Sequence, residues 1–152
     1  TRLYRAEKEE VPDLPDEIPL RKARLAREGK DVTAVAWGAM VPTVLQAAEK
    51  VAVSGISVEV IDLRTLNPMD TAVILASVKK TGRAVIVHEA PKTCGLGAEI
   101  SALIAENALL SLNAPVLRVT APDITVPLPK LEDAYYVGPD RVAAGLIRVT
   151  EF

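Results

Sequence analysis

Residues 31–63, DVTAVAWGAMVPTVLQAAEKVAVSGISVEVIDL, contain the pattern that decides the fold. Two short apolar runs rich in β-branched residues, 31–37 and 56–63, flank a longer segment with apolar residues at helical spacing. The runs predict buried strands, and the segment predicts a helix with Pro42 in its first turn and Gly55 as its stop. A strand, a helix and a strand in succession favour parallel pairing through a right-handed crossover.

The same alternation continues to the end of the chain. Asp70 is placed to cap a second helix that ends at Gly82, and residues 83–88 predict a third parallel strand. Residues 114–120 predict another strand, and a last helix is expected from Pro139 onward. We therefore expect the α/β class, as a three-layer α/β/α sandwich.

The first 28 residues have a different character. Residues 1–19 are rich in Glu, Asp and Pro, which predicts a linker, and residues 20–152 then form one domain. Residues 20–28 alternate charges with Leu and Ala, as a half-exposed edge strand does. Because Thr1 is not a methionine and no apolar leader follows it, we expect a fragment of a longer protein.

Composition excludes several classes of function. With 49% hydrophobic and 25% charged residues, the chain resembles an ordinary globular domain, and no apolar run approaches the roughly 20 residues that span a bilayer. A formal net charge of −2 with interspersed signs argues against nucleic-acid binding. Cys94 is the only cysteine, so no internal disulfide can form and a reducing compartment is expected.

Residues 95–100, GLGAEI, follow a predicted strand and open a predicted helix, as a dinucleotide-binding turn does. Ile100 stands where that fingerprint has its third glycine, and Glu99 in the first helical turn would repel a phosphate. We interpret Gly95 and Gly97 as positions of close backbone packing, with phosphate binding as the alternative.

His88, Glu89 and Cys94 invite catalytic interpretations. His88 and Glu89 could act as an acid and base, but neighbours in a strand point to opposite faces and cannot easily serve one reacting atom. Cys94 could be a nucleophile activated by His88, but no third orienting group accompanies them. A metal site would need several further carboxylates. We expect His88 to be structural.

Residues 62–70, DLRTLNPMD, form the most specific segment. Arg64 follows a buried strand and is expected to make a bidentate ion pair with Asp62, Asp70 or Glu89, which would fix the loop through Pro68 that starts the next helix. The alternative is a substrate anion site, which the nearby acids disfavour.

This segment resembles the strand-to-helix loop of the transketolase C-terminal domain, and four other stretches agree in order with beta subunits of thiamine-diphosphate-dependent 2-oxo acid dehydrogenases. The resemblance covers essentially the whole chain. Those stretches are LYRA (3–6) with EEVP (9–12), DVT (31–33) with GAMV (38–41), HEAP (88–91) with GAEI (97–100), and APV (114–116) through RV (118–119) to APD (121–123) and Pro127.

The resemblance implies a mostly parallel five-stranded sheet with one antiparallel edge strand. It also implies that thiamine diphosphate and magnesium are bound by an alpha subunit and by an N-terminal pyrimidine-binding domain of beta that precedes the linker. On this expectation, the 152 residues hold no catalytic, cofactor-binding or metal-binding residue. The whole enzyme would convert pyruvate or a branched-chain 2-oxo acid to carbon dioxide and an acyl group on lipoamide.

The resemblance also implies partners. They are an alpha subunit and a second beta subunit in a heterotetramer, and the subunit-binding domain of a lipoyl acyltransferase core. Glu151 and Phe152, with the terminal carboxylate, are the residues expected to contact that core, and the alternative is that Phe152 only packs on its own helix. A bacterial or archaeal cytoplasm is the expected location, with the mitochondrial matrix as the alternative.

Two other functions remain open at this point. The domain could belong to another thiamine enzyme, such as acetoin dehydrogenase, transketolase or deoxyxylulose-phosphate synthase. It could also be a free-standing module that binds a nucleotide or anion at Gly95.

Overall fold

The computed structural model describes residues 19–127 and 129–152, so residues 1–18 of the predicted linker lie outside the described part of the chain. One five-stranded sheet runs through the domain in the order β1-β3-β2-β4-β5. Strand β1 is antiparallel to β3, and the other neighbouring pairs are parallel, which confirms the predicted fold class. The strands are β1 (Arg24–Arg27), β2 (Val32–Ala36), β3 (Val58–Asp62), β4 (Ala84–Pro91) and β5 (Leu117–Ala121).

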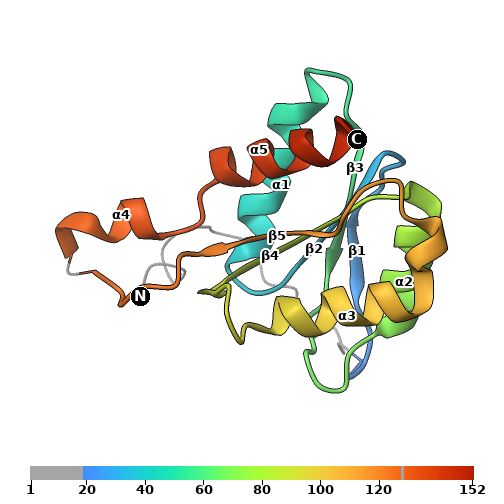
Figure 1. The fold of residues 1–152 in the computed structure, drawn as a ribbon, viewed down its shortest axis with the longest axis horizontal. Helices are drawn as coiled ribbons and strands as arrows, with labels where there is room; N and C mark the ends of the chain where they lie inside the picture. Colours follow the sequence, from blue (N-terminus) through green and yellow to red (C-terminus); the bar gives the residue numbers. More distant parts are fainter. Residues whose placement is uncertain (1–18, 128) are drawn as a thin grey trace, which may run out of the picture.

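Helices cover both faces of this sheet (Figure 1). Helices α1 (Met40–Ala52) and α5 (Pro139–Thr150) lie together on one face, and α2 (Thr71–Thr81) and α3 (Leu96–Ala108) lie together on the other. Each face has its own apolar core, built on alternate residues of the same strands. The remaining helical segments are short: η2 (Leu109–Ser111), η3 (Pro129–Leu131) and α4 (Glu132–Tyr135).

The helix ends follow the residues that the sequence singles out, with one difference. The Asp70 carboxylate accepts hydrogen bonds from the backbone N–H groups of Val73 at 3.4 Å and Ala23 at 3.1 Å, so it caps α2 and also ties down the segment before β1. Gly82 ends α2 in the left-handed conformation, at φ +70°. Helix α1 ends at Ala52, earlier than expected, and Gly55 with φ +81° turns the chain afterwards.

Two strand boundaries also differ from expectation. Strand β4 continues to Pro91 through an irregularity after His88, where its pairing with β5 shifts. Strand β5 begins only at Leu117, because Pro115 has no backbone N–H to offer to a ladder.

Two buried polar residues of the sheet, Thr33 and Glu59, are paired with side chains of α2. The hydroxyl of Thr33 on β2 lies 2.7 Å from the hydroxyls of both Ser77 and Thr81 on α2. Glu59 on β3 is 3% exposed and pairs with Lys80. Burial alone would raise the pKa of Glu59, but hydrogen bonds from Lys80 and Ser77 outweigh burial and hold that pKa below its ordinary value. These contacts fix α2 against β2 and β3.

Gly145 sets the distance between α5 and the sheet. A Cβ at this position would lie 2.7 Å from Cγ2 of Val119 and 3.2 Å from Cδ2 of Leu117.

We expect Gly145→Leu to lower the free energy of unfolding by about 1–3 kcal/mol, although leucine favours helix, because the side chain overfills the contact. Chemical denaturation measures this effect. Ala144→Leu on the exposed side of α5 is the matched control and should stay within about 0.5 kcal/mol of the parent. Equal stability of the two variants would contradict the close contact.

Candidate functional site

His88 lies near the carboxyl end of β4, and its side chain is enclosed. The residue is 1% exposed, and its ring stacks on Trp37 with 5.5 Å between centroids and 16° between planes. A Cβ on Gly95 or on Gly97 would lie 2.5 Å from a ring atom of His88. Only glycine therefore lets the start of α3 approach this ring.

The ring of His88 is shielded as well as buried. Neither Nδ1 nor Nε2 has a hydrogen-bond partner of ordinary geometry in the described part of the chain. Burial is the main influence on the pKa of His88 and lowers it; the backbone of Ala90 acts in the opposite direction, and the Arg118 guanidinium lowers the pKa again. A neutral ring with no access to solvent suits a packing role better than proton exchange with a substrate.

The other two candidate catalytic groups do not join His88. The side chain of Glu89 is exposed, whereas His88 next to it faces inward, so the two do not address one reacting atom. Cys94 is exposed and its backbone is left-handed, at φ +58°. The adjacent Thr93 donates its backbone N–H and its hydroxyl to the carboxylate of Asp123, at 2.9 Å and 2.7 Å, which holds the turn against the segment after β5.

The glycine turn packs instead of offering a phosphate site. Helix α3 begins at Leu96, and buried Gly97 faces His88 instead of open space. Glu99 occupies the first turn of α3 and is exposed, so a negative charge already sits at this helix N-terminus. Gly95 and Gly97 thus lie in close contact with the protein itself.

In the loop over residues 62–70, the carboxylate of Asp62 makes polar contacts with Arg24 and Arg64. The Asp62 carboxylate accepts from Arg24 at 3.3 Å and from the backbone N–H of Arg64 at 3.2 Å, and Nε of Arg64 lies 3.9 Å away. The expected ion pair of Arg64 is therefore with Asp62, but its expected bidentate geometry is wrong: Arg64, at φ +54°, makes one long contact through Nε, while Asp70 is occupied at the cap of α2 and Glu89 is exposed. The peptide bond before Pro68 is cis.

A second group of candidate residues lies at the other end of the parallel strands, where the strands have their amino termini. We call this end of the sheet the amino edge. Glu151 and Phe152 follow the last turn of α5, and the Phe152 side chain is 68% exposed. The same edge carries η2 after α3, where Leu109 is 62% and Leu110 fully exposed. Two hydrogen bonds attach the segment after η2 and the end of α5 to the turn before β4. The Asn113 N–H donates to the Gly82 carbonyl at 2.7 Å, and Nε of Arg83 donates to the Val149 carbonyl at 2.9 Å.

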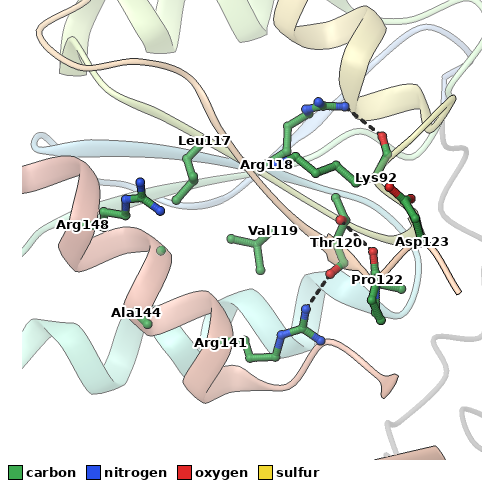
Figure 2. Close-up of a pocket in the computed structure, with 12 residues that line it drawn as sticks. Lys92, Leu117, Arg118, Val119, Thr120, Pro122, Asp123, Arg141, Ala144 and Arg148 are labelled. Atoms are coloured by element: carbon green, nitrogen blue, oxygen red, sulfur yellow. Dashed lines mark hydrogen bonds between the residues drawn. The ribbon is translucent and has the colours of Figure 1, made fainter. Parts of the chain in front are cut away.

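A third surface is a shallow open groove along β5 and α5 (Figure 2). Most of its charged lining residues are cationic, and Asp123 is the one carboxylate among the residues that line it. The basic side chains are those of Lys92, Arg118, Arg141 and Arg148.

The described residues do not fit a metal-bound diphosphate. No group of three or more His, Cys, Asp or Glu side chains that could hold a metal ion occurs within residues 19–127 and 129–152. Asp70 caps α2, Glu99 and Asp140 lie in the first turns of α3 and α5, and Asp62 lines the groove beside the start of α1. Each of these acids would repel a phosphate at the helix end nearby.

Comparison with known proteins decides the family. The sequence model described as "Transketolase, C-terminal domain" matches residues 21–142, which is most of the chain. The chain belongs to the transketolase C-terminal domain family. This assignment agrees with the five-stranded sheet and confirms the family inferred from residues 62–70.

Relatives of two kinds are similar along nearly the whole chain. The pyruvate dehydrogenase E1 component subunit beta of Bacillus subtilis is 45% identical over 151 residues, which are 99% of this chain and 46% of the relative. The corresponding Staphylococcus epidermidis subunit is 48% identical over 134 residues, 88% of this chain and 41% of the relative. The mitochondrial 2-oxoisovalerate dehydrogenase subunit beta of Dictyostelium discoideum is 51% identical over 144 residues, 92% of this chain and 37% of the relative.

The chain thus spans less than half the length of the curated relatives it matches. Among solved structures, a "Split gene transketolase, inactive beta4 tetramer" superposes with a TM-score of 0.79 at 28% identity, over 95% of this chain and 46% of that one. In the described residues, no helix is both long enough and apolar enough to cross a membrane.

Sequence reasoning missed several contacts. The stacking of Trp37 on His88 joins two different strand ends, and no local pattern signals such a contact. The contact of Arg24 with Asp62 depends on the register of β1 against β3. The basic groove collects residues from three distant segments, although the spacing of Arg141 and Arg148 by two helical turns was a usable signal.

Acidification should test the enclosure of His88. The pKa of His88 is lowered in the folded state, so the unfolded chain binds the proton more readily and stability is lost as pH falls below about 6.5, the ordinary histidine value. The loss can reach about 1.4 kcal/mol per pH unit. We expect His88→Gln, which cannot titrate, to lose less stability than the parent between pH 7.5 and 5.0 in urea unfolding. Identical pH profiles would show that His88 is accessible when folded.

Proposed function

We propose that this chain is the C-terminal domain of the beta subunit of a 2-oxo acid dehydrogenase, where it supports subunit assembly and docking to the acyltransferase core. The observation that carries the proposal is the 45% identity with a pyruvate dehydrogenase E1 beta subunit across 99% of the chain. The 28% identity with the transketolase chain is lower, which favours a dehydrogenase over a transketolase.

The reaction of the whole enzyme is proposed to be oxidative decarboxylation of a 2-oxo acid with acyl transfer to lipoamide. Relatives named for pyruvate and for 2-oxoisovalerate are 45% and 51% identical to the chain, so the proposal covers both pyruvate and branched-chain substrates. Residues 1–19 are proposed to link residues 20–152 to a preceding pyrimidine-binding domain. The proposed location is the bacterial cytoplasm, by analogy with the bacterial relatives, with the mitochondrial matrix as the alternative.

No residue of this chain is proposed as catalytic. His88 is enclosed, Glu89 beside it is exposed, and the starts of α2, α3 and α5 carry acids. Thiamine diphosphate, which supplies the carbanion chemistry of decarboxylation when bound, and its magnesium ion are proposed to sit on an alpha subunit and another beta domain.

Docking to the acyltransferase core is proposed at the amino edge of the sheet. Glu151 and Phe152 are exposed there, and the exposed Leu109 and Leu110 lie at the same edge. The carboxyl ends of α3 and α5 meet this edge and, like Glu151, favour a basic partner. An alpha subunit and a second beta subunit are the other proposed partners, and the beta tetramer named for the similar transketolase supports contact between beta chains.

The docking proposal can be tested by titrating the 152-residue chain with the subunit-binding domain of a lipoyl acyltransferase. We expect the double variant Glu151→Ala/Phe152→Ala to bind about tenfold more weakly, because an exposed aromatic anchor and an acidic contact are lost together. Ile124→Ala is the matched control, since Ile124 is 60% exposed at the opposite edge. Unchanged affinity of the double variant would remove Glu151 and Phe152 from the contact.

The cofactor proposal has its own test. Calorimetric titration of the chain with thiamine diphosphate and magnesium should give no saturable heat, because the starts of α2, α3 and α5 carry acids and Asp62 lies beside the start of α1. Nucleotide titration under the same conditions tests the alternative of an anion-binding module at Gly95. Micromolar binding of either ligand would overturn the supporting role.

A further inference from the structure

Strand β5 leaves an edge of the sheet without a neighbouring strand, and this edge is accessible at Leu117 and Arg118, whereas Val119, Thr120 and Ala121 are buried. The strand is the last in the order β1-β3-β2-β4-β5 and pairs only with β4. The Thr120 carbonyl points away from β4, since Arg141 of α5 donates to it at 2.7 Å. In a parallel strand the backbone groups of residues two apart point the same way, so the N–H and carbonyl of Arg118 also face outward. An unpaired edge of this kind is a template for another strand.

Cations flank this edge on both faces of the sheet. Arg118 pairs with Ile86, which belongs to the core under α2 and α3, so the side chain of Arg118 lies on that face. Arg141 and Arg148 project from α5 on the other face, and Figure 2 shows them across β5 from Arg118 and Lys92. A strand added at this edge would point successive side chains toward opposite faces, where each would meet a cation.

Three of the four cations have no carboxylate partner within the part of the chain that the structure describes, whereas Lys92 lies near Asp123, whose carboxylate pKa is lowered by hydrogen bonds from Thr93 and by Lys92. Among the described residues, no carboxylate makes an ion pair with Arg118, Arg141 or Arg148. Arg118 donates to the Lys92 carbonyl at 2.9 Å, and Arg141 donates to the carbonyls of Tyr135, Tyr136 and Thr120. These hydrogen bonds hold the guanidinium groups in place but leave their positive charge available to a partner.

The floor of the groove carries small and apolar residues. Ala144 is exposed on α5 between Arg141 and Arg148, and buried Gly145 beside it packs against Val119 and Leu117 of β5. Arg141 and Arg148 are seven residues apart, a rise of about 10 Å along the helix, which equals about three residues of extended chain.

We propose that the outer edge of β5, with Lys92, Arg118, Arg141 and Arg148, binds an extended acidic segment of a partner polypeptide as an added strand. Backbone pairing with Arg118 supplies affinity, and the cations on both faces select acidic side chains. A second copy of this chain fits less well, because pairing two β5 edges would bring the same arginines together and like charges directly opposite each other destabilise a sheet. This surface is distinct from the amino-edge docking surface, so the two proposals can fail independently.

Fluorescence anisotropy with the 152-residue chain tests the proposal. The probe is a blocked peptide of roughly eight residues, a strand's length, with glutamates at adjacent positions that face both sides. We expect saturable binding that weakens with added salt. The same peptide N-methylated at alternate residues keeps its charge but cannot pair as a strand, and it should not bind. A lysine analogue should also fail to bind.

Three variants separate charge from backbone pairing. Arg118→Gln/Arg148→Gln should weaken peptide binding about tenfold, as expected for two partly exposed charge contacts. Arg24→Gln/Lys79→Gln removes two charges elsewhere, at the opposite sheet edge and on α2, and should bind like the parent. Arg118→Pro removes the outward N–H without touching the ladder to β4, so it should bind more weakly than Arg118→Gln. Circular dichroism checks that each variant is folded.

Several results would overturn the proposal. Equal binding of the N-methylated and unmodified peptides would indicate charge attraction without strand pairing, and full displacement by millimolar inorganic phosphate would indicate a small-anion site. If Arg118→Gln/Arg148→Gln bound the peptide as tightly as the parent, Arg118 and Arg148 would not contribute to peptide binding. Sedimentation that shows a dimer of the parent, lost in Arg118→Pro but kept in Arg118→Gln/Arg148→Gln, would assign this edge to a second copy.

Discussion

The structure depends on the burial of its central sheet from both sides. All five residues of β2 are buried, and β3 and β4 satisfy the backbone groups at its two edges. A strand covered on both faces needs helices above and below, which the crossovers through α1 and α2 supply. Because apolar packing fills the interior on both sides, functional groups can reach solvent only at the two ends of the strands and at the two edges of the sheet.

The positions of the candidate residues follow from this constraint. His88 stands at a strand end, where a catalytic residue of an α/β protein would stand, yet Trp37, Gly95 and Gly97 enclose it. The carboxyl edge is thus filled by the protein's own side chains and capped by acids. The amino edge with Phe152 and the groove along β5 stay accessible, and both are proposed docking surfaces.

Helix boundaries could be predicted from the sequence where a single residue type satisfies the local backbone. Asp70 and Gly82 bound α2 because a carboxylate satisfies free N–H groups and glycine accepts the left-handed turn. Pro139 begins α5, and Val142, Leu146 and Val149 are buried at helical spacing as expected. The start of β5 was misplaced because Pro115 was read as part of an apolar run, although it cannot donate to a ladder. The bidentate pairing of Arg64 failed for a different reason, since ion-pair geometry depends on side-chain conformation, which sequence spacing does not determine.

Contacts between distant segments lay beyond sequence reasoning. The three hydroxyls of Thr33, Ser77 and Thr81 meet across β2 and α2, and each looks like an ordinary small polar residue in the sequence. One such contact also has a mechanical consequence. Because Arg83 at the start of β4 holds the Val149 carbonyl near the end of α5, a partner that pulls on the chain beyond Thr150 would load the middle of the sheet, not a single peripheral helix. The parallel ladders of β4 with β2 and β5 would then share that load between three strands.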